Sequence, residues 1–192
     1  MINGSDLIYG ANGEFTSNKY FKLSSAYYLK NGYLSLPPNI YIQGSYTVMS
    51  WVRVISITQY IRLFEVGTSS SYITFLLSNT NSLQLINALY ISLPTDVLGM
   101  CTQTKLTLNK WTHVAFVLNT NLIGYIYIDG VKVNYDKTST QLPQALTRNM
   151  NYIGRSRFYP YDPDANFVID DLKIFNRGLS LTEILYEMNN NV

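Results

Sequence analysis

The chain has 192 residues, a formal net charge of +2, and charged side chains at 14% of its positions. This length fits one medium-sized domain with a substantial core, which needs no disulfide or zinc ion for stability. The low charge argues against the basic stripe of a nucleic-acid-binding protein, and no apolar run reaches the roughly 20 residues of a membrane span. The single cysteine, Cys101, excludes an intrachain disulfide and is expected to be buried.

Short apolar and aromatic runs, separated by Asn, Gly, Ser and Pro, follow one another between residues 13 and 178. Many short strands with turn residues between them are typical of a β-sandwich or barrel. No internal repeat of roughly 20–50 residues is visible, which argues against a propeller or solenoid. The expected strands are 26–30, 33–36, 46–55, 60–66, 72–77, 83–86, 111–118, 123–128, 131–134, 151–154 and 166–175.

Two local patterns are specific. In 125-YIYIDGVKVN-134, the pair Asp129-Gly130 predicts a two-residue type I′ turn between two strands. Near the end of the sequence, 180-SLTE-183 has the spacing of a capping box, which predicts the start of a helix. Leu179 and Ile184 are placed to form the accompanying hydrophobic staple. The sequence therefore predicts a β domain that ends in one short helix.

The run 167-FVIDDLKIF-175 places two adjacent acids in an otherwise apolar strand. Strict alternation along a strand would put Asp170 on the face of Val168 and Leu172, and Asp171 on the opposite face. An ionised carboxylate on an apolar face requires partners. We therefore expect Asp170 to need compensation, and Asp171 to be solvated.

The residues that catalysis requires are sparse. The 12 acidic residues include no Glu-x-Asp-x-Glu pattern, so the paired carboxylates of a glycosidase are not indicated. The only histidine, His113, lies in the apolar run 111-WTHVAFV-117 and is expected to be a core residue. No G-x-S-x-G or phosphate-binding glycine motif occurs. The sequence therefore predicts a protein that is not an enzyme.

The segment 155-RSRFYPYDPDAN-166 is the strongest candidate for a binding site. Aromatic planes beside planar hydrogen-bonding groups suit a sugar ring or a protein epitope. The alternative is a hydrated loop whose aromatic side chains only cover the edge of the sandwich. The residues predicted to contact a ligand are Arg155, Arg157, Tyr159, Tyr161, Asp162 and Asn166.

Three segments carry a family resemblance. They are 46-YTVMSWVRV-54, the W-x-H-V-A strand with its Y-x-D-G hairpin in 108–133, and the closing I-G-R, I-D-D and N-R-x-L-S-x-x-E-I elements of 152–184. Together they resemble the LamG-like domains of the concanavalin A-like lectin/glucanase superfamily, related to laminin G and pentraxin modules. The Asn/Ile/Tyr-rich strands are also similar to the N-terminal jelly roll of clostridial neurotoxin receptor-binding regions.

The resemblance implies an all-β fold: an antiparallel two-sheet β-sandwich (jelly roll, concanavalin A-like) with one short C-terminal helix. It implies that residues 1–192 form a single domain of a larger extracellular or cell-surface protein. The implied function is that of a non-catalytic, lectin-like or adhesion module that binds a glycan or glycoprotein. The alternative is a structural or interaction module with a protein ligand and no sugar site.

The resemblance also implies one structural calcium ion. Many domains of this kind hold Ca²⁺ with the aspartate of the closing strand, which by motif is Asp170. A second ligand is expected from the N-terminal segment, where Asp6 is the candidate, since Ca²⁺ prefers oxygen ligands. The alternative is that Asp170 accepts backbone or arginine hydrogen bonds and binds no metal.

Overall fold

The computed structural model describes residues 9–190, apart from 81, 93–94 and 135–136. Alternating apolar residues and frequent turns give these residues a largely β structure with one short helix. The elements in chain order are β1 (Tyr9–Thr16), β2 (Ala26–Ser35), β3 (Tyr46–Val54), β4 (Arg62–Gly67), β5 (Tyr72–Leu76), β6 (Gln84–Ser92), β7 (Thr95–Lys105), β8 (Thr112–Leu118), β9 (Ile123–Ile128), β10 (Val131–Lys132), β11 (Lys137–Thr138), β12 (Met150–Ile153), β13 (Ala165–Phe175) and α1 (Leu181–Asn189).

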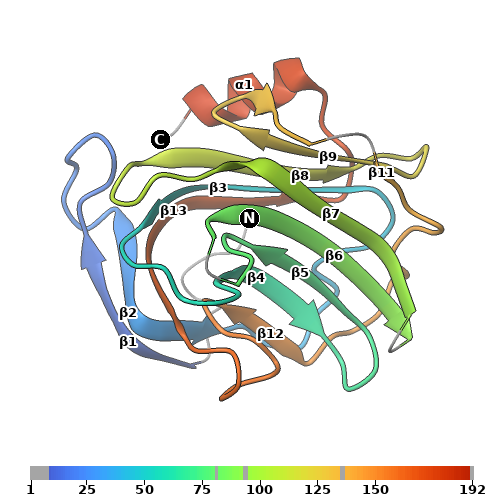
Figure 1. Cartoon of the computed structure of the whole chain (residues 1–192), viewed down its shortest axis with the longest axis horizontal. Coiled ribbons are helices and arrows are strands. Elements are labelled where there is room, and N and C mark those ends of the chain that lie inside the picture. Colours follow the sequence, from blue (N-terminus) through green and yellow to red (C-terminus); the bar gives the residue numbers. More distant parts are fainter. Residues whose placement is uncertain (1–8, 81, 93–94, 135–136, 191–192) are drawn as a thin grey trace.

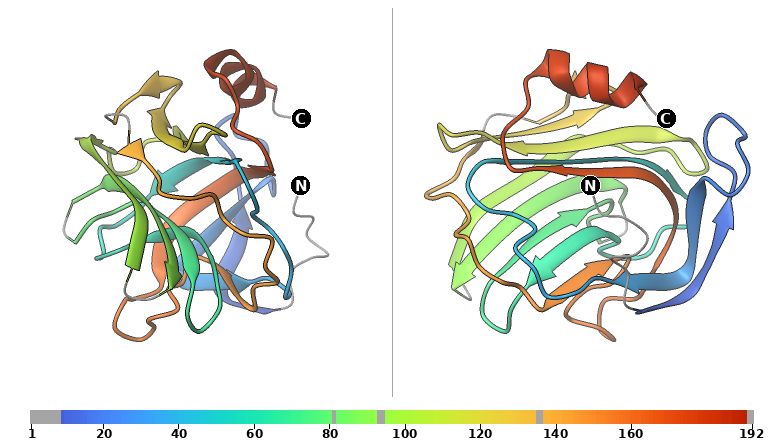
Figure 2. Two further views of the ribbon diagram at one scale, coloured as in Figure 1. Left: turned by 90° about the vertical axis from the view of Figure 1, so that its right-hand side faces the viewer. Right: turned by 180° about the vertical axis from the view of Figure 1, so that it is seen from behind.

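The strands form two facing layers (Figures 1 and 2). They are hydrogen-bonded along the path β10-β9-β8-β3-β13-β2-β12-β4-β5-β6-β7, with β1 on β2 and β11 on β9. The path folds over at β2, whose residues 27–32 pair with β13 while Leu34 and Ser35 pair with β12. We call β3, β8, β9, β10 and β13 with the first part of β2 the back sheet. The rest of β2 with β12, β4, β5, β6 and β7 is the front sheet. The predicted antiparallel sandwich is confirmed.

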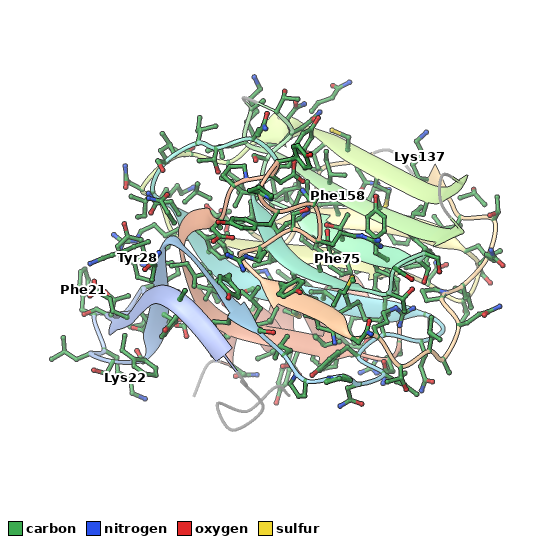
Figure 3. All side chains as sticks on the ribbon, turned by 90° about the horizontal axis from the view of Figure 1, so that it is seen from below. Phe21, Lys22, Tyr28, Phe75, Lys137 and Phe158 are labelled. Atoms are coloured by element: carbon green, nitrogen blue, oxygen red, sulfur yellow. The ribbon has the colours of Figure 1, made fainter. Side chains whose placement is uncertain are left out.

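An aromatic cluster fills the space between the sheets. Phe75 of β5, labelled in Figure 3, lies at its centre. Its ring centroid is 6.1 Å from that of Phe64, 5.3 Å from that of Phe116 and 5.7 Å from that of Tyr46. All four rings are fully buried and come from both sheets. Side chains of this size contribute about 1.5–3 kcal/mol each when buried, so this cluster holds the two layers together.

The helix α1 covers the outer face of the back sheet and lies above β8 and β9 in Figure 1. The predicted capping box is present, since the Ser180 N–H donates to Glu183 Oε2 at 2.8 Å and the Glu183 N–H donates to Ser180 Oγ. Leu179 and Ile184 are buried against Met49 and neighbouring side chains of the back sheet. The described residues include no helix long and apolar enough to cross a membrane.

Several boundaries differ from the sequence-based expectation. The Asp129-Gly130 turn is confirmed, because both residues have positive φ and Val131 pairs with Ile128. The expected strands 26–30 and 33–36 form one strand, β2. Strands β1, β7 and β11 were not predicted. The expected burial of Cys101 was wrong, since on β7 the neighbouring Met100 and Thr102 point to the core and Cys101 is exposed.

Candidate functional site

The loop between β12 and β13, residues 154–164, lies over the outer face of the front sheet. It leaves the sheet at Gly154, where φ is +82° and a Cβ would come within 2.6 Å of a Leu29 methyl carbon, so glycine is required. The ring of Phe158, labelled in Figure 3, packs edge-on against Tyr72 of β5 at 5.8 Å. We call this segment the β12–β13 loop.

A buried ionic network fixes the loop to β4. The Arg62 side chain, on a residue only 6% exposed, donates from Nε to Glu65 Oε2 at 2.8 Å and from Nη2 to Asp162 Oδ2 at 2.9 Å. The same Nη2 also donates to Ser156 Oγ, and Nη1 to the Tyr60 carbonyl. The other oxygen of the fully buried Glu65 accepts the Arg157 N–H at 2.7 Å. Every charge in the network has partners, as burial requires.

The two arginines of the loop also make internal contacts. Arg155 forms a bidentate pair with Asp164 at 2.6 and 2.7 Å, and its guanidinium lies between the rings of Tyr33 and Tyr159, 3.3 and 4.1 Å from their centroids. The hydrogen bond to Asp164 raises the pKa of Arg155 above its ordinary value. Arg157 donates to the carbonyls of residues 68 and 69, each at 2.6 Å. Both cations therefore hold the loop in shape.

Two tyrosines of the loop face solvent. Tyr161 is 85% exposed and Tyr159 is 51% exposed. The Tyr161 carbonyl accepts a hydrogen bond from Gln59 Nε2 at 3.2 Å, which attaches the tip of the loop to the segment before β4. Asn166 points elsewhere, since it donates to Ser56 Oγ and accepts from the Tyr28 hydroxyl. Of the six predicted ligand residues, these two tyrosines present the most free surface, and the other four support the loop and its flanks.

Sequence reasoning missed the residues beneath the loop. Arg62 and Glu65 lie in the run 60-YIRLFEV-66, and Tyr33 and Tyr72 lie on other strands of the front sheet. A signal for the first pair was present, because two opposite charges three residues apart in an apolar strand indicate a buried ion pair. Nothing in the sequence shows that their third partner is Asp162, a hundred residues away from Arg62.

The expected inward orientation of Asp170 was wrong. Asp170 pairs with Trp51 and Lys173 pairs with Met49, so Asp171 and Leu172 together oppose Ser50 in a β-bulge. Asp171 has φ +50°, and the Ser50 hydroxyl donates to the Asp170 carbonyl at 2.8 Å. The bulge inverts the alternation, so residues 167, 169, 172 and 174 all pack on the core. Asp170 thereby lies on the outer face of the back sheet.

On that outer face Asp170 belongs to a polar cluster. Its Oδ1 accepts the Asp171 N–H at 3.0 Å, and its pKa is raised to about 6 by burial and by the charge of Asp171. The ammonium of Lys19 lies 3.1 Å from the centroid of a Trp51 ring, and burial lowers the pKa of Lys19 to about 8. The expected buried His113 is confirmed, and burial lowers its pKa to about 3, so it is neutral at pH 7.

These residues offer little to a calcium ion. The described part of the chain contains no group of three or more His, Cys, Asp or Glu side chains that could hold a metal. The charge of Lys19 acts on both Asp170 and Asp171, where it would repel a cation. The other predicted ligand, Asp6, lies outside the described residues. Asp170 accepts the backbone hydrogen bond of the alternative interpretation, and the calcium ion stays a prediction.

Solved structures with the same fold come from binding domains and from enzymes. Domain 4 of AbnA, an extracellular arabinanase of Geobacillus stearothermophilus, was solved with arabinotriose; it matches with a TM-score of 0.70 and 20% identity over 91% of this chain and 87% of that domain. The binding domain of the botulinum neurotoxin of serotype G matches with a TM-score of 0.66 and 15% identity, over 94% of this chain and 45% of that one. A mutant of Trypanosoma rangeli sialidase matches with a TM-score of 0.63 and 17% identity, over 92% of this chain and 28% of that one.

These identities establish the fold alone, and this chain spans less than half of the toxin and sialidase chains. No curated protein sequence is similar enough to this chain to count as a match. The sequence model described as the concanavalin A-like lectin/glucanases superfamily, a laminin G family, matches residues 29–185. That span includes both sheets, the β12–β13 loop and the start of α1. The chain therefore belongs to the laminin G family of the concanavalin A-like lectin/glucanase superfamily.

Proposed function

We propose that the chain is a non-catalytic carbohydrate-binding module, and that Tyr159 and Tyr161 contact the glycan. The observation that carries the proposal is their exposure on a loop that buried ion pairs hold in place. The C–H groups of a sugar ring pack against flat aromatic faces, and a tyrosine hydroxyl adds a polar contact. A loop that is ordered before binding loses little conformational entropy on binding, which favours affinity.

The supporting residues explain why the loop is ready to bind. Arg155 stacks directly against the ring of Tyr159 at 4.1 Å, which fixes the plane of that ring. Asp162 adjoins Tyr161 in the chain and is tied to Arg62, so the backbone beneath Tyr161 is fixed as well. We assign Arg155, Arg157 and Asp162 as positioning residues, and the two tyrosines as the contact residues.

Relatives of the same fold support this class of ligand. One is a domain solved in complex with arabinotriose. Another is a protein of Bacteroides ovatus that has been provisionally named as carbohydrate-binding. The arabinanase is extracellular, in line with our proposal that the present chain acts outside the cell or at its surface. A protein ligand remains the alternative, because the same aromatic surface suits an epitope.

A glycan array probed with the purified chain tests the proposal. We expect Tyr159→Ala and Tyr161→Ala each to weaken glycan binding by about tenfold, or about 1.4 kcal/mol, the scale of one aromatic contact. Tyr186→Ala is the matched control, because Tyr186 is 66% exposed but lies on α1. The absence of any bound glycan, or wild-type binding by both loop variants, would exclude this site.

A further inference from the structure

A second exposed aromatic surface lies on the turn between β1 and β2. We call residues 17–25 the β1–β2 tip. Phe21 is 87% exposed and Leu23 is 80% exposed, with Tyr20 beside them also largely in solvent. Figure 1 shows this turn projecting beyond the sandwich at the upper left, and Figure 3 places Phe21 and Lys22 at the edge of the molecule. Apolar side chains gathered on a protrusion indicate a contact surface.

The tip is an ordered turn. The Asn18 side-chain oxygen accepts hydrogen bonds from the N–H groups of Tyr20 and Lys22 at 2.9 and 3.1 Å. The Asn18 N–H donates to the Lys22 carbonyl, and the Ser25 hydroxyl donates to the same carbonyl at 2.7 Å. Phe21 at the apex has φ +63°, a conformation that bulky residues rarely adopt. The Phe21 side chain, which is 87% exposed, projects from this ordered turn into solvent.

The base of the tip is attached to the back sheet. Lys19 turns inward over the ring of Trp51 and interacts with the charges of Asp170 and Asp171. Lys22, by contrast, is exposed and follows Phe21 directly. The tip 17-SNKYFKLSS-25 carries these two lysines and no acid. Its outer end is thus apolar, aromatic and positively charged.

We propose that the β1–β2 tip inserts into the interfacial layer of a membrane that contains anionic lipids. Aromatic rings favour the headgroup region, apolar side chains such as Phe21 and Leu23 favour the acyl chains beneath it, and the exposed Lys22 attracts anionic headgroups. A convex tip with side chains on its outside suits a fluid lipid layer, whereas a protein partner would have to supply a matching hollow. This inference uses none of the residues of the proposed glycan site.

Co-sedimentation with lipid vesicles tests the proposal. We expect the purified chain to bind vesicles of phosphatidylcholine with phosphatidylserine, and to bind vesicles of phosphatidylcholine alone much more weakly. The double variant Phe21→Ser/Leu23→Ser should lose about 100-fold in affinity, because two large apolar side chains no longer leave water. Lys22→Gln should lose about fivefold, and added salt should weaken the wild type.

Two controls separate this site from other surfaces. Val131→Ser removes an apolar side chain that is 64% exposed and precedes Lys132 on another hairpin, and it should bind vesicles like the wild type. Tyr161→Ala should also bind vesicles normally while affecting glycan binding, so the two proposals can fail separately. A thermal melt of each variant confirms folding, which should be unchanged because the replaced side chains lie in solvent.

Three outcomes would overturn the proposal. The first is no sedimentation with either vesicle. The second is vesicle binding that survives Phe21→Ser/Leu23→Ser. The third is a concentration-dependent dimer in analytical ultracentrifugation that this double variant abolishes, because the tip would then bind a second copy of the chain in place of lipid.

Discussion

The buried carboxylate of Glu65 is expected to be essential for stability, because it binds both Arg62 and the backbone of the β12–β13 loop. Glu65→Ala would leave the Arg62 guanidinium, on a residue 6% exposed, without the acceptor for its Nε, and would leave the Arg157 N–H without the oxygen it now reaches at 2.7 Å. Removing one partner of a buried ion pair costs about 3–5 kcal/mol. Asp162 still bonds to Arg62, so we expect about 3 kcal/mol, the lower end of that range.

Urea unfolding followed by tryptophan fluorescence measures this loss, because the chain has two tryptophans, Trp51 and Trp111, in the back-sheet region. For a domain of this size 3 kcal/mol corresponds to a fall of about 6–12 °C in the thermal midpoint. Glu14→Ala is the control, since its salt bridge with Lys30 is half exposed and should leave the midpoint unchanged. Glu65→Ala should also weaken glycan binding through loosening of the β12–β13 loop.

A double variant tests the cause of the loss. In Arg62→Met/Glu65→Leu no buried cation is left without its carboxylate, so part of the lost stability should return, as for other buried pairs replaced by apolar residues. The recovery should be partial, because Asp162 and the Arg157 N–H then lose their partners. The reasoning is refuted if Glu65→Ala costs less than about 1 kcal/mol, or if the double variant is no more stable than Arg62→Met.

Three further predictions concern the back sheet and the helix. The folded-state pKa of Asp170, about 6, lies above its ordinary value of 3.8, so its contribution to stability is fully present below 3.8 and is lost as the pH rises through about 6. Asp170→Asn should therefore raise stability at pH 8, by about 1 kcal/mol after allowance for solvent screening, and not at pH 3.5; chemical denaturation at the two pH values checks this. Because Lys19 already supplies positive charge beside Asp170, EDTA should leave the thermal midpoint unchanged, whereas a lowered midpoint that Ca²⁺ restores would establish the calcium ion instead. Ser180→Ala should cost about 1 kcal/mol through loss of the helix cap, and a gain or no change in urea unfolding would contradict the capping role.

The features predicted best from the sequence depend on neighbouring residues. The Asp129-Gly130 turn needs two adjacent residues with positive φ, and the Ser180–Glu183 capping box needs a spacing of three. Both signals are complete within a few residues, so the sequence specifies them directly. The closing strand was located correctly for the same reason, because its apolar run and the helix cap that follows lie close together in the chain.

The features that were missed depend on distant partners. The orientation of Asp170 follows from a bulge opposite Ser50, a residue 120 positions earlier in the chain. A prediction that assumes strict alternation along one strand has no means of locating such a bulge. Strand β7 contains glycine and several polar residues, and it is a strand because β6 pairs with it. The composition of the β12–β13 loop indicated an aromatic-rich candidate binding site, and its role as a binding site stays a prediction. It could not show that Arg155 and Asp162 are bonded inside the protein.

In the β12–β13 loop, different residues fix the backbone and face the solvent, which makes the loop a suitable site for protein engineering. The contacts that determine its backbone path, from Arg62 and Glu65 to Asp162, are buried, while the side chains of Tyr159 and Tyr161 project into solvent. Exposed positions can be substituted at little cost in stability when the backbone is held by other residues. A randomised library at these two positions would therefore sample new ligand specificities on an unchanged scaffold.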